Sequence, residues 1–144
     1  KKNISIALAE SCTGGYLGKI LTDVAGASKV FNGSIVAYSN AIKINQLDIS
    51  QEKLNKYGAV SSQVAEDMAC SIRNLFESDL GLSITGISGP EGSGTNKMIG
   101  LVYVSISFKD ISITKEFNFN LDRDLNRKMT CYAALNMIRK IIND

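Results

Sequence analysis

Histidine is absent from the 144 residues of this chain, and tryptophan is absent as well. Without an imidazole, the sequence excludes Ser-His-Asp and Cys-His catalysis, a histidine general base and histidine-ligated zinc. Any proton transfer at a catalytic site must therefore use another base, and the nitrogen base that remains available is lysine.

Cysteine, net charge and long apolar runs are also scarce. Cys12, Cys70 and Cys131 form no Cys-x-x-Cys pair, which argues against zinc and redox motifs and makes a reducing compartment the default. The 16 basic and 14 acidic residues leave a charge of +2, too little to indicate nucleic acid or an anionic membrane as a partner. The apolar segment 4–9 is too short for a secretory signal, and no run approaches the roughly 18 residues of a membrane span. We therefore expect a cytoplasmic protein without a bound metal.

The length and the 44% hydrophobic content fit a single domain over residues 1–144. Short β-rich runs predict strands at 4–9, 30–38, 80–85, 99–108 and 111–119. Helical spacing and capping residues predict a helix that reaches Val24, and further helices that begin at Ser39 or Asn40, Ser50, Ser61 or Ser62, and Asp122 or Asp124. This order predicts a layered α/β/α fold with a mixed, mostly parallel sheet and a late antiparallel hairpin.

Three of the predicted strands end in loops with chemical potential, at 10–15, 38–43 and 86–94. Ligands in open α/β sheets bind outside the carboxyl ends of strands, which places these loops where a site is expected. The first loop combines three candidate nucleophiles with two glycines before a helix: Ser11, Cys12, Thr13, Gly14 and Gly15. The free N–H groups of that helix can hold an anion or an oxyanion, although a simple turn with a capping hydroxyl explains the same residues. Glu10 can bond a ligand hydroxyl, a lysine or water.

The second loop supplies a base, because Lys43 lies in the first turn of a predicted helix. The helix dipole and burial both lower the pKa of a lysine at that position, and Ser-Lys catalysis is an established variant of the triad. Tyr38 can orient the lysine or relay a proton. The alternatives are a tyrosine at the sheet edge and a solvated lysine.

The third loop offers backbone N–H groups and Ser88 near a strand end, which suits a phosphate or a ribose, or else forms a surface loop. Arg123 and Arg127 are four residues apart, so they share a helix face and can clamp a phosphate or carboxylate. The alternative is that they form surface salt bridges with neighbours such as Asp124.

Several segments together carry a family resemblance. They are 9–15 (AESCTGG), 33–40 (GSIVAYSN) with Lys43, 58–61 (GAVS), 85–90 (TGISGP) and 122–124 (DRD). In this order they resemble the C-terminal domain of the competence/damage-inducible protein CinA, the family of nicotinamide-nucleotide amidohydrolases. The resemblance covers nearly the whole chain. The first helix of that family precedes the first strand, so we expect a helix upstream of Lys1.

The resemblance implies hydrolysis of the carboxamide of nicotinamide mononucleotide to nicotinate mononucleotide and ammonia, within pyridine-nucleotide salvage and without a cofactor. In this reading Ser11 attacks the amide carbon, with Thr13 left open as the alternative nucleophile; Lys43 takes and returns the proton, and Tyr38 assists. The residues expected to bind the small-molecule mononucleotide are Glu10, Cys12, Thr13, Gly14, Gly15, Asn40, Gly86, Ser88, Gly89 and Arg123. A homo-oligomer stays open as an expectation.

Two other functions also fit the residues. The chain can be a non-catalytic nucleotide-binding or regulatory domain that keeps a phosphate site, in which case a nucleotide raises its melting temperature and no ammonia is released. It can also be an interaction domain that uses its final helix, which requires a large exposed apolar patch.

Overall fold

A mixed sheet forms the middle layer of the fold. The computed structural model describes residues 3–92 and 94–143, and within them the sheet has five strands in the order β2-β1-β3-β4-β5. The strands are β1 (Ile6–Glu10), β2 (Phe31–Val36), β3 (Leu80–Gly86), β4 (Leu101–Phe108) and β5 (Ile111–Asn118). β1 pairs in parallel with β2 and β3, whereas β3–β4 and β4–β5 are antiparallel, so only β4 runs against the others.

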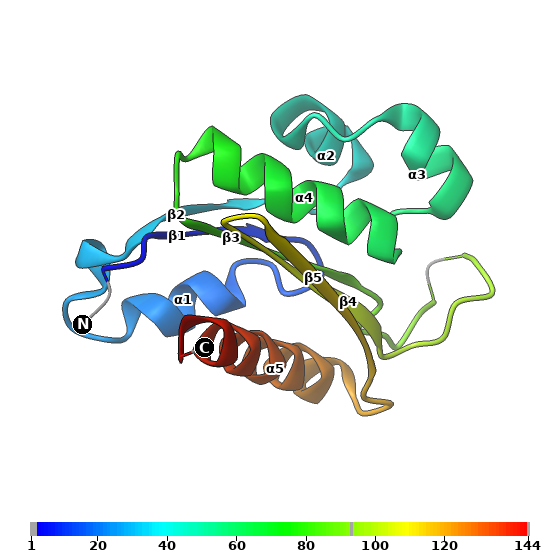
Figure 1. Ribbon diagram of the computed structural model, residues 1–144. Helices are drawn as coiled ribbons and strands as arrows, with labels where there is room; N and C mark the ends of the chain where they lie inside the picture. Colours follow the sequence, from blue (N-terminus) through cyan, green and yellow to red (C-terminus); the bar gives the residue numbers. More distant parts are fainter. Residues whose placement is uncertain (1–2, 93, 144) are drawn as a thin grey trace.

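Helices cover both faces of this sheet (Figure 1). One face carries α1 (Tyr16–Thr22) and α5 (Arg123–Asn143), and the other carries α2 (Asn40–Leu47), α3 (Gln51–Tyr57) and α4 (Ser62–Leu75). A short 3-10 helix, Ala27–Lys29, leads into β2. The predicted α/β/α layering is confirmed. In the described part of the chain, no helix is long and apolar enough to cross a membrane.

Alternation along β1 assigns its side chains to two separate cores. Leu8 packs with residues of α1 and α5, whereas Ala7 and Ala9 pack beneath α2, α3 and α4. Because both faces are covered, every residue of β1 is buried. The same alternation sends Glu10 toward α1 and the following residue, Ser11, toward α2.

Capping side chains fix where the helices begin. Where the sequence left two candidates, the structure selects the first of each pair: Ser39 over Asn40, Ser61 over Ser62, and Asp122 over Asp124. Each selected oxygen accepts a backbone N–H three residues ahead, as an N-cap does.

Two predicted boundaries were wrong. α1 ends at Thr22, leaving Val24 outside the helix and exposed, and β4 begins after Gly100, whose φ of +88° interrupts the extended chain.

The chain changes direction around β1. It passes from β1 to β2 on one side of the sheet, then crosses through α2, α3 and α4 to β3 on the other side of β1. Such a switch point opens a crevice outside the carboxyl ends of the strands. The loops that follow β1, β2 and β3 all lie at this edge, because the three strands are parallel.

Candidate active site

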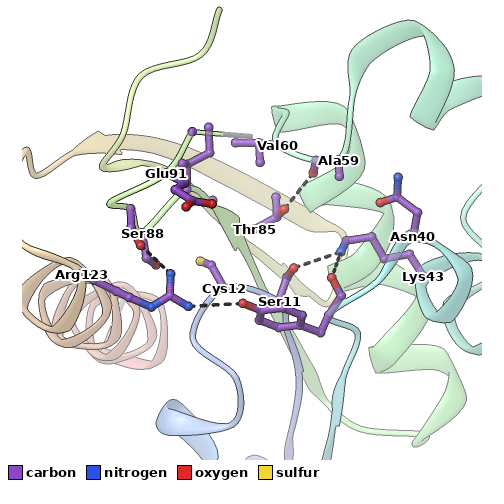
Figure 2. A pocket seen from close by; sticks show the side chains of 15 residues that line it. Ser11, Cys12, Asn40, Lys43, Ala59, Val60, Thr85, Ser88, Glu91 and Arg123 are labelled. Atoms are coloured by element: carbon purple, nitrogen blue, oxygen red, sulfur yellow. Dashed lines mark hydrogen bonds between the residues drawn. The ribbon is translucent and has the colours of Figure 1, made fainter. Parts of the chain in front are cut away.

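A cavity of about 370 Å³ opens at the switch point (Figure 2). Its volume lies within the range of small-molecule sites, roughly 300–1,000 Å³. The cavity brings together residues from all three strand-end loops and from the start of α5. The predicted site residues that line it are Ser11, Cys12, Tyr38, Asn40, Lys43, Gly86, Ser88, Gly89 and Arg123.

Ser11 and Lys43 are directed toward one another from different elements (Figure 2). Lys43 Nζ donates to Ser11 Oγ at 3.0 Å and to the carbonyl oxygens of Ala37 and Tyr38 at 2.8 and 3.4 Å. The lysine is 1% exposed and the serine 8% exposed. The cap of α2 by Ser39 fixes the first turn, and this turn carries Lys43 back over the end of β1.

Burial sets the protonation of this lysine. Removing the ammonium from water lowers the pKa of Lys43 from 10.5 to about 8, against a smaller opposing effect of Cys12. A neutral amine keeps two N–H groups for the two carbonyl oxygens and has one lone pair left for the Ser11 hydroxyl. The surroundings therefore suit Lys43 to accept a proton from Ser11.

Ser11 is held at the end of the β1–β3 ladder. Its N–H donates to the Ile84 carbonyl oxygen at 3.0 Å, and its own carbonyl accepts the Gly14 N–H at 3.0 Å. The other candidate nucleophile, Thr13, is fully buried, and its hydroxyl donates to Glu10 Oε1 at 2.6 Å. The geometry thus brings Ser11, and not Thr13, to Lys43.

Glu10 does not line the cavity, contrary to the expected contact with a ligand. Its carboxylate is fully buried and accepts the backbone N–H groups of Leu17 and Gly18 at 2.9 and 3.0 Å, besides the Thr13 hydroxyl. These bonds stabilise the start of α1, whose N-cap, Gly15, has no side chain to do so. The physical reason is the parity of the strand, because Glu10 and Ser11 point to opposite faces of the sheet.

The rest of the first turn is structural in the same way. Thr13, Gly14 and Gly15 lie outside the cavity lining, and both glycines adopt positive φ, +59° and +98°. The oxyanion role expected of the N–H groups in this loop is not open to Gly14, because its N–H already donates to the Ser11 carbonyl oxygen. In the described part of the chain, the N–H groups of Cys12 and Thr13 donate to no backbone oxygen, and of these two residues only Cys12 lines the cavity.

Cys12 is a poor nucleophile in this setting. Burial raises the pKa of its thiol to about 11, with a smaller opposing effect from the neighbouring Ser88 hydroxyl. The thiol is therefore protonated at neutral pH, and the reactive form of cysteine is the thiolate.

Arg123 reaches the mouth of the cavity and meets Tyr38 there. Its guanidinium donates to the Gly89 carbonyl at 2.6 Å and to the Tyr38 hydroxyl at 3.3 Å. The hydroxyl of Tyr38 thus faces the arginine, and only its backbone carbonyl contacts Lys43. Direct assistance of Lys43 by the phenol is not what this geometry provides.

The two arginines of α5 do not form one clamp. Arg127 donates to the Thr13 carbonyl at 2.9 Å and lies over the ring of Tyr16, away from the cavity. Asp124, the expected salt-bridge partner, pairs instead with Lys128 at 3.0 Å.

Three residues that line the cavity or hold its loops in place were missed by sequence reasoning. Glu91 lines the cavity, and Asn126 donates to the Ser88 carbonyl at 2.8 Å. Lys97 donates to the carbonyl oxygens of Tyr57, at 2.8 Å, and Val60. Two sequence features could have indicated them: for Glu91, an acid within a glycine-rich loop, and for Asn126, an amide on the apolar side of a helix.

Ser93, in the same loop as Glu91, lies outside the described residues. Among the described residues, no group of three Cys, Asp or Glu side chains could hold a metal ion.

Sequence comparisons identify the family of this chain. A family model for the CinA C-terminal domain matches residues 1–142. A CinA-like protein from Prochlorococcus marinus is 47% identical over 145 residues, covering 99% of this chain and 34% of that protein. A CinA-like protein from Cytophaga hutchinsonii is 42% identical over 144 residues, covering 100% of this chain and 34% of that protein. The chain spans about a third of the length of these curated relatives.

Solved structures give the same result. The competence damage-inducible protein A (ComA) from Klebsiella pneumoniae superimposes with a TM-score of 0.95 at 27% identity, over 98% of this chain and 88% of that one. The competence/damage inducible protein CihA from Agrobacterium tumefaciens gives a TM-score of 0.92 at 32% identity, over 96% and 85%. The family model and the solved structures agree, and this chain belongs to the CinA C-terminal domain family.

Proposed function

We propose that the chain is an amidohydrolase that converts nicotinamide mononucleotide to nicotinate mononucleotide and ammonia. The observation that carries the proposal is the Ser11–Lys43 pair, 3.0 Å apart and buried at the floor of a cavity of small-molecule size. Family membership and the match to the CinA motifs support the choice of a nicotinamide nucleotide as substrate.

In the proposed reaction, neutral Lys43 accepts the hydroxyl proton as Ser11 Oγ attacks the carboxamide carbon. The N–H of Cys12, next to the nucleophile, stabilises the oxyanion of the tetrahedral intermediate. Lys43 then gives its proton to the leaving nitrogen, which departs as ammonia and leaves an acyl ester on Ser11. Water attacks this ester with Lys43 again as the base, and the carboxylate product leaves.

The other end of the substrate is assigned to the mouth of the cavity. One carbonyl oxygen, of Gly89, and one hydroxyl, of Tyr38, already orient Arg123, and its remaining N–H groups suit a phosphate. The backbone of Ser88 and Gly89 borders the same space and suits the ribose or the phosphate.

The test is ammonia release from nicotinamide mononucleotide by the purified chain, with the carboxylate product identified by mass spectrometry. We expect Ser11→Ala and Lys43→Met each to lower kcat by about a thousandfold or more, because the two groups act as one unit. Ser62→Ala and Lys140→Met, which remove the same groups outside the cavity, should keep full activity. Below pH 8 the kcat/KM of the wild type should rise about tenfold per pH unit, then level off above the pKa of Lys43.

Other outcomes would point elsewhere. Retained release by Ser11→Ala would move the nucleophile to Thr13 or to an activated water. No release by the wild type, with a nucleotide-dependent rise in melting temperature, would favour a non-catalytic binding domain.

A further inference from the structure

The cavity contains one acidic side chain among the described residues that line it. This residue is Glu91, and its carboxylate is directed toward the side of the cavity formed by Cys12 and Ser88 (Figure 2). The cationic residues of the lining are Lys43, which is buried beside Ser11 and about half protonated at pH 8, and Arg123 at the mouth. The site therefore offers one positive and one negative group at its open side.

Glu91 forms no ion pair within the described part of the chain. The ion pairs found there are Lys19–Asp23, Lys53–Asp67 and Lys128–Asp124. The nearby guanidinium of Arg123 is instead bonded to Gly89 and Tyr38. A carboxylate that faces a ligand cavity without a cationic partner is free to attract a positive charge on the ligand.

The segment that carries Glu91 is fastened at both ends. We call the described residues 87–92 and 94–100 the strap. At its start, Asn126 and Arg123 donate to the carbonyls of Ser88 and Gly89 at 2.8 and 2.6 Å. At its end, Lys97 donates to the carbonyls of Tyr57 and Val60. The Gly100 N–H donates to the Ile87 carbonyl oxygen at 2.6 Å, which joins the two ends of the strap. These bonds hold the Glu91 side of the strap against the cavity.

We propose that Glu91 is a specificity-determining residue that selects amides whose aromatic ring carries a positive charge. The inference rests on the proposed function. The pyridinium ring of nicotinamide mononucleotide carries a full positive charge, and its phosphate is negative. With the phosphate on Arg123, the ring lies between Arg123 and Ser11, on the side of the cavity toward which Glu91 is directed. The paired charges of the substrate thus match the paired charges of the cavity.

The test compares two ligands that differ in ring charge. Nicotinamide mononucleotide and its 1,4-dihydro form share the amide, ribose and phosphate, but the reduced ring is neutral. Dissociation constants are measured by calorimetry in the Ser11→Ala background, which removes chemistry from the comparison. We expect Glu91→Gln to weaken binding of the charged form about five- to tenfold, and binding of the neutral form by less than about twofold.

Two further variants separate charge recognition from structure. Glu66→Gln makes the same charge change on an exposed position of α4 outside the cavity, and should leave both dissociation constants unchanged. Lys97→Met releases the end of the strap, and should weaken both ligands by similar factors. If Glu91→Gln also weakens both equally, Glu91 has a structural role and the proposal is overturned.

The dissociation constants, together with the ammonia assay of the wild type, distinguish the two proposals. Ammonia release by the wild type without a ring-selective effect of Glu91→Gln refutes the role of Glu91 alone. A ring-selective effect without ammonia release refutes the hydrolysis alone. If the chain binds neither form, both proposals fail.

Discussion

The proton on Lys43 links the chemistry of this residue to the stability of the chain. The pKa of Lys43 is about 8 in the folded protein and near 10.5 once the chain unfolds and the amine returns to water. Between these two values the unfolded state binds more protons than the folded state, so the free energy of unfolding rises with pH. Below pH 8 Lys43 is protonated in both states, and the folded state then carries the full desolvation penalty of a buried ammonium.

This gives a prediction for Lys43→Met, which keeps the length of the side chain without a titratable group. Relative to this variant, the wild type should gain roughly 2–3 kcal/mol of unfolding free energy between pH 8 and pH 10.5. Urea denaturation of both proteins at several pH values measures the difference. A difference that does not change with pH would mean that Lys43 is not desolvated in the folded chain.

Sequence reasoning succeeded at residues whose chemistry had few alternatives. Without histidine, a lysine near a strand-end serine is the natural base, and Lys43 and Ser11 do meet. It failed at Glu10 because a sequence does not say which face of a strand lies under which helix. Because side chains alternate along a strand, the position of α1 on one face of β1 directs Glu10 to that face and away from the cavity. Glu91 was missed because the path of an irregular loop depends on distant contacts, such as that of Lys97 with Tyr57.

At the scale of elements, α1 depends on a carboxylate from the preceding strand. Glu10 accepts the two N–H groups at the start of the helix and the Thr13 hydroxyl. Replacing one carboxylate oxygen by an NH₂ group would place donors against donors in a fully buried position.

We therefore predict that Glu10→Gln lowers the free energy of unfolding by about 2–3 kcal/mol. Equilibrium unfolding in urea measures it, with Glu66→Gln on the surface of α4 as the control for the change of charge. An effect no larger than that of the control would show that the helix start has another source of stability.

Element boundaries were predictable where side chains decide them, and not elsewhere. Ser50 and Ser61 cap their helices, as hydroxyls before an apolar periodic run indicate. The start of β4 was placed too early because Ile99 is β-leaning, whereas Gly100 turns the chain. A methyl group at Gly100 would lie 2.6 Å from the Asn120 N atom, a long-range contact that local propensity cannot reveal.

At the scale of the whole molecule, α4 must lie very close to the sheet. A Cβ atom at Gly81 of β3 would be 2.2 Å from the Ala69 carbonyl oxygen and 2.6 Å from Arg73 Cβ. Both neighbours belong to α4, and the carbonyl oxygen is backbone, so the helix as a unit would have to move away. Its start lies next to Val60, which forms part of the cavity wall.

Gly81→Ala should accordingly destabilise the fold by about 3 kcal/mol through overpacking. Gly92→Ala is the matched control, because an added Cβ there meets nothing within 4 Å. Thermal unfolding of the two variants compares them directly. Equal melting temperatures would contradict the close approach of α4 to β3.

The position of Ser11 one residue beyond β1 has a consequence for how the protein responds to heat. Its N–H bonds the Ile84 carbonyl and so extends the pairing of the two central strands into the cavity. This bond is continuous with the pairing of β1 and β3 at the centre of the core, so the position of Ser11 depends on the most buried part of the sheet. We therefore expect loss of turnover on heating to coincide with melting of the fold, rather than to precede it.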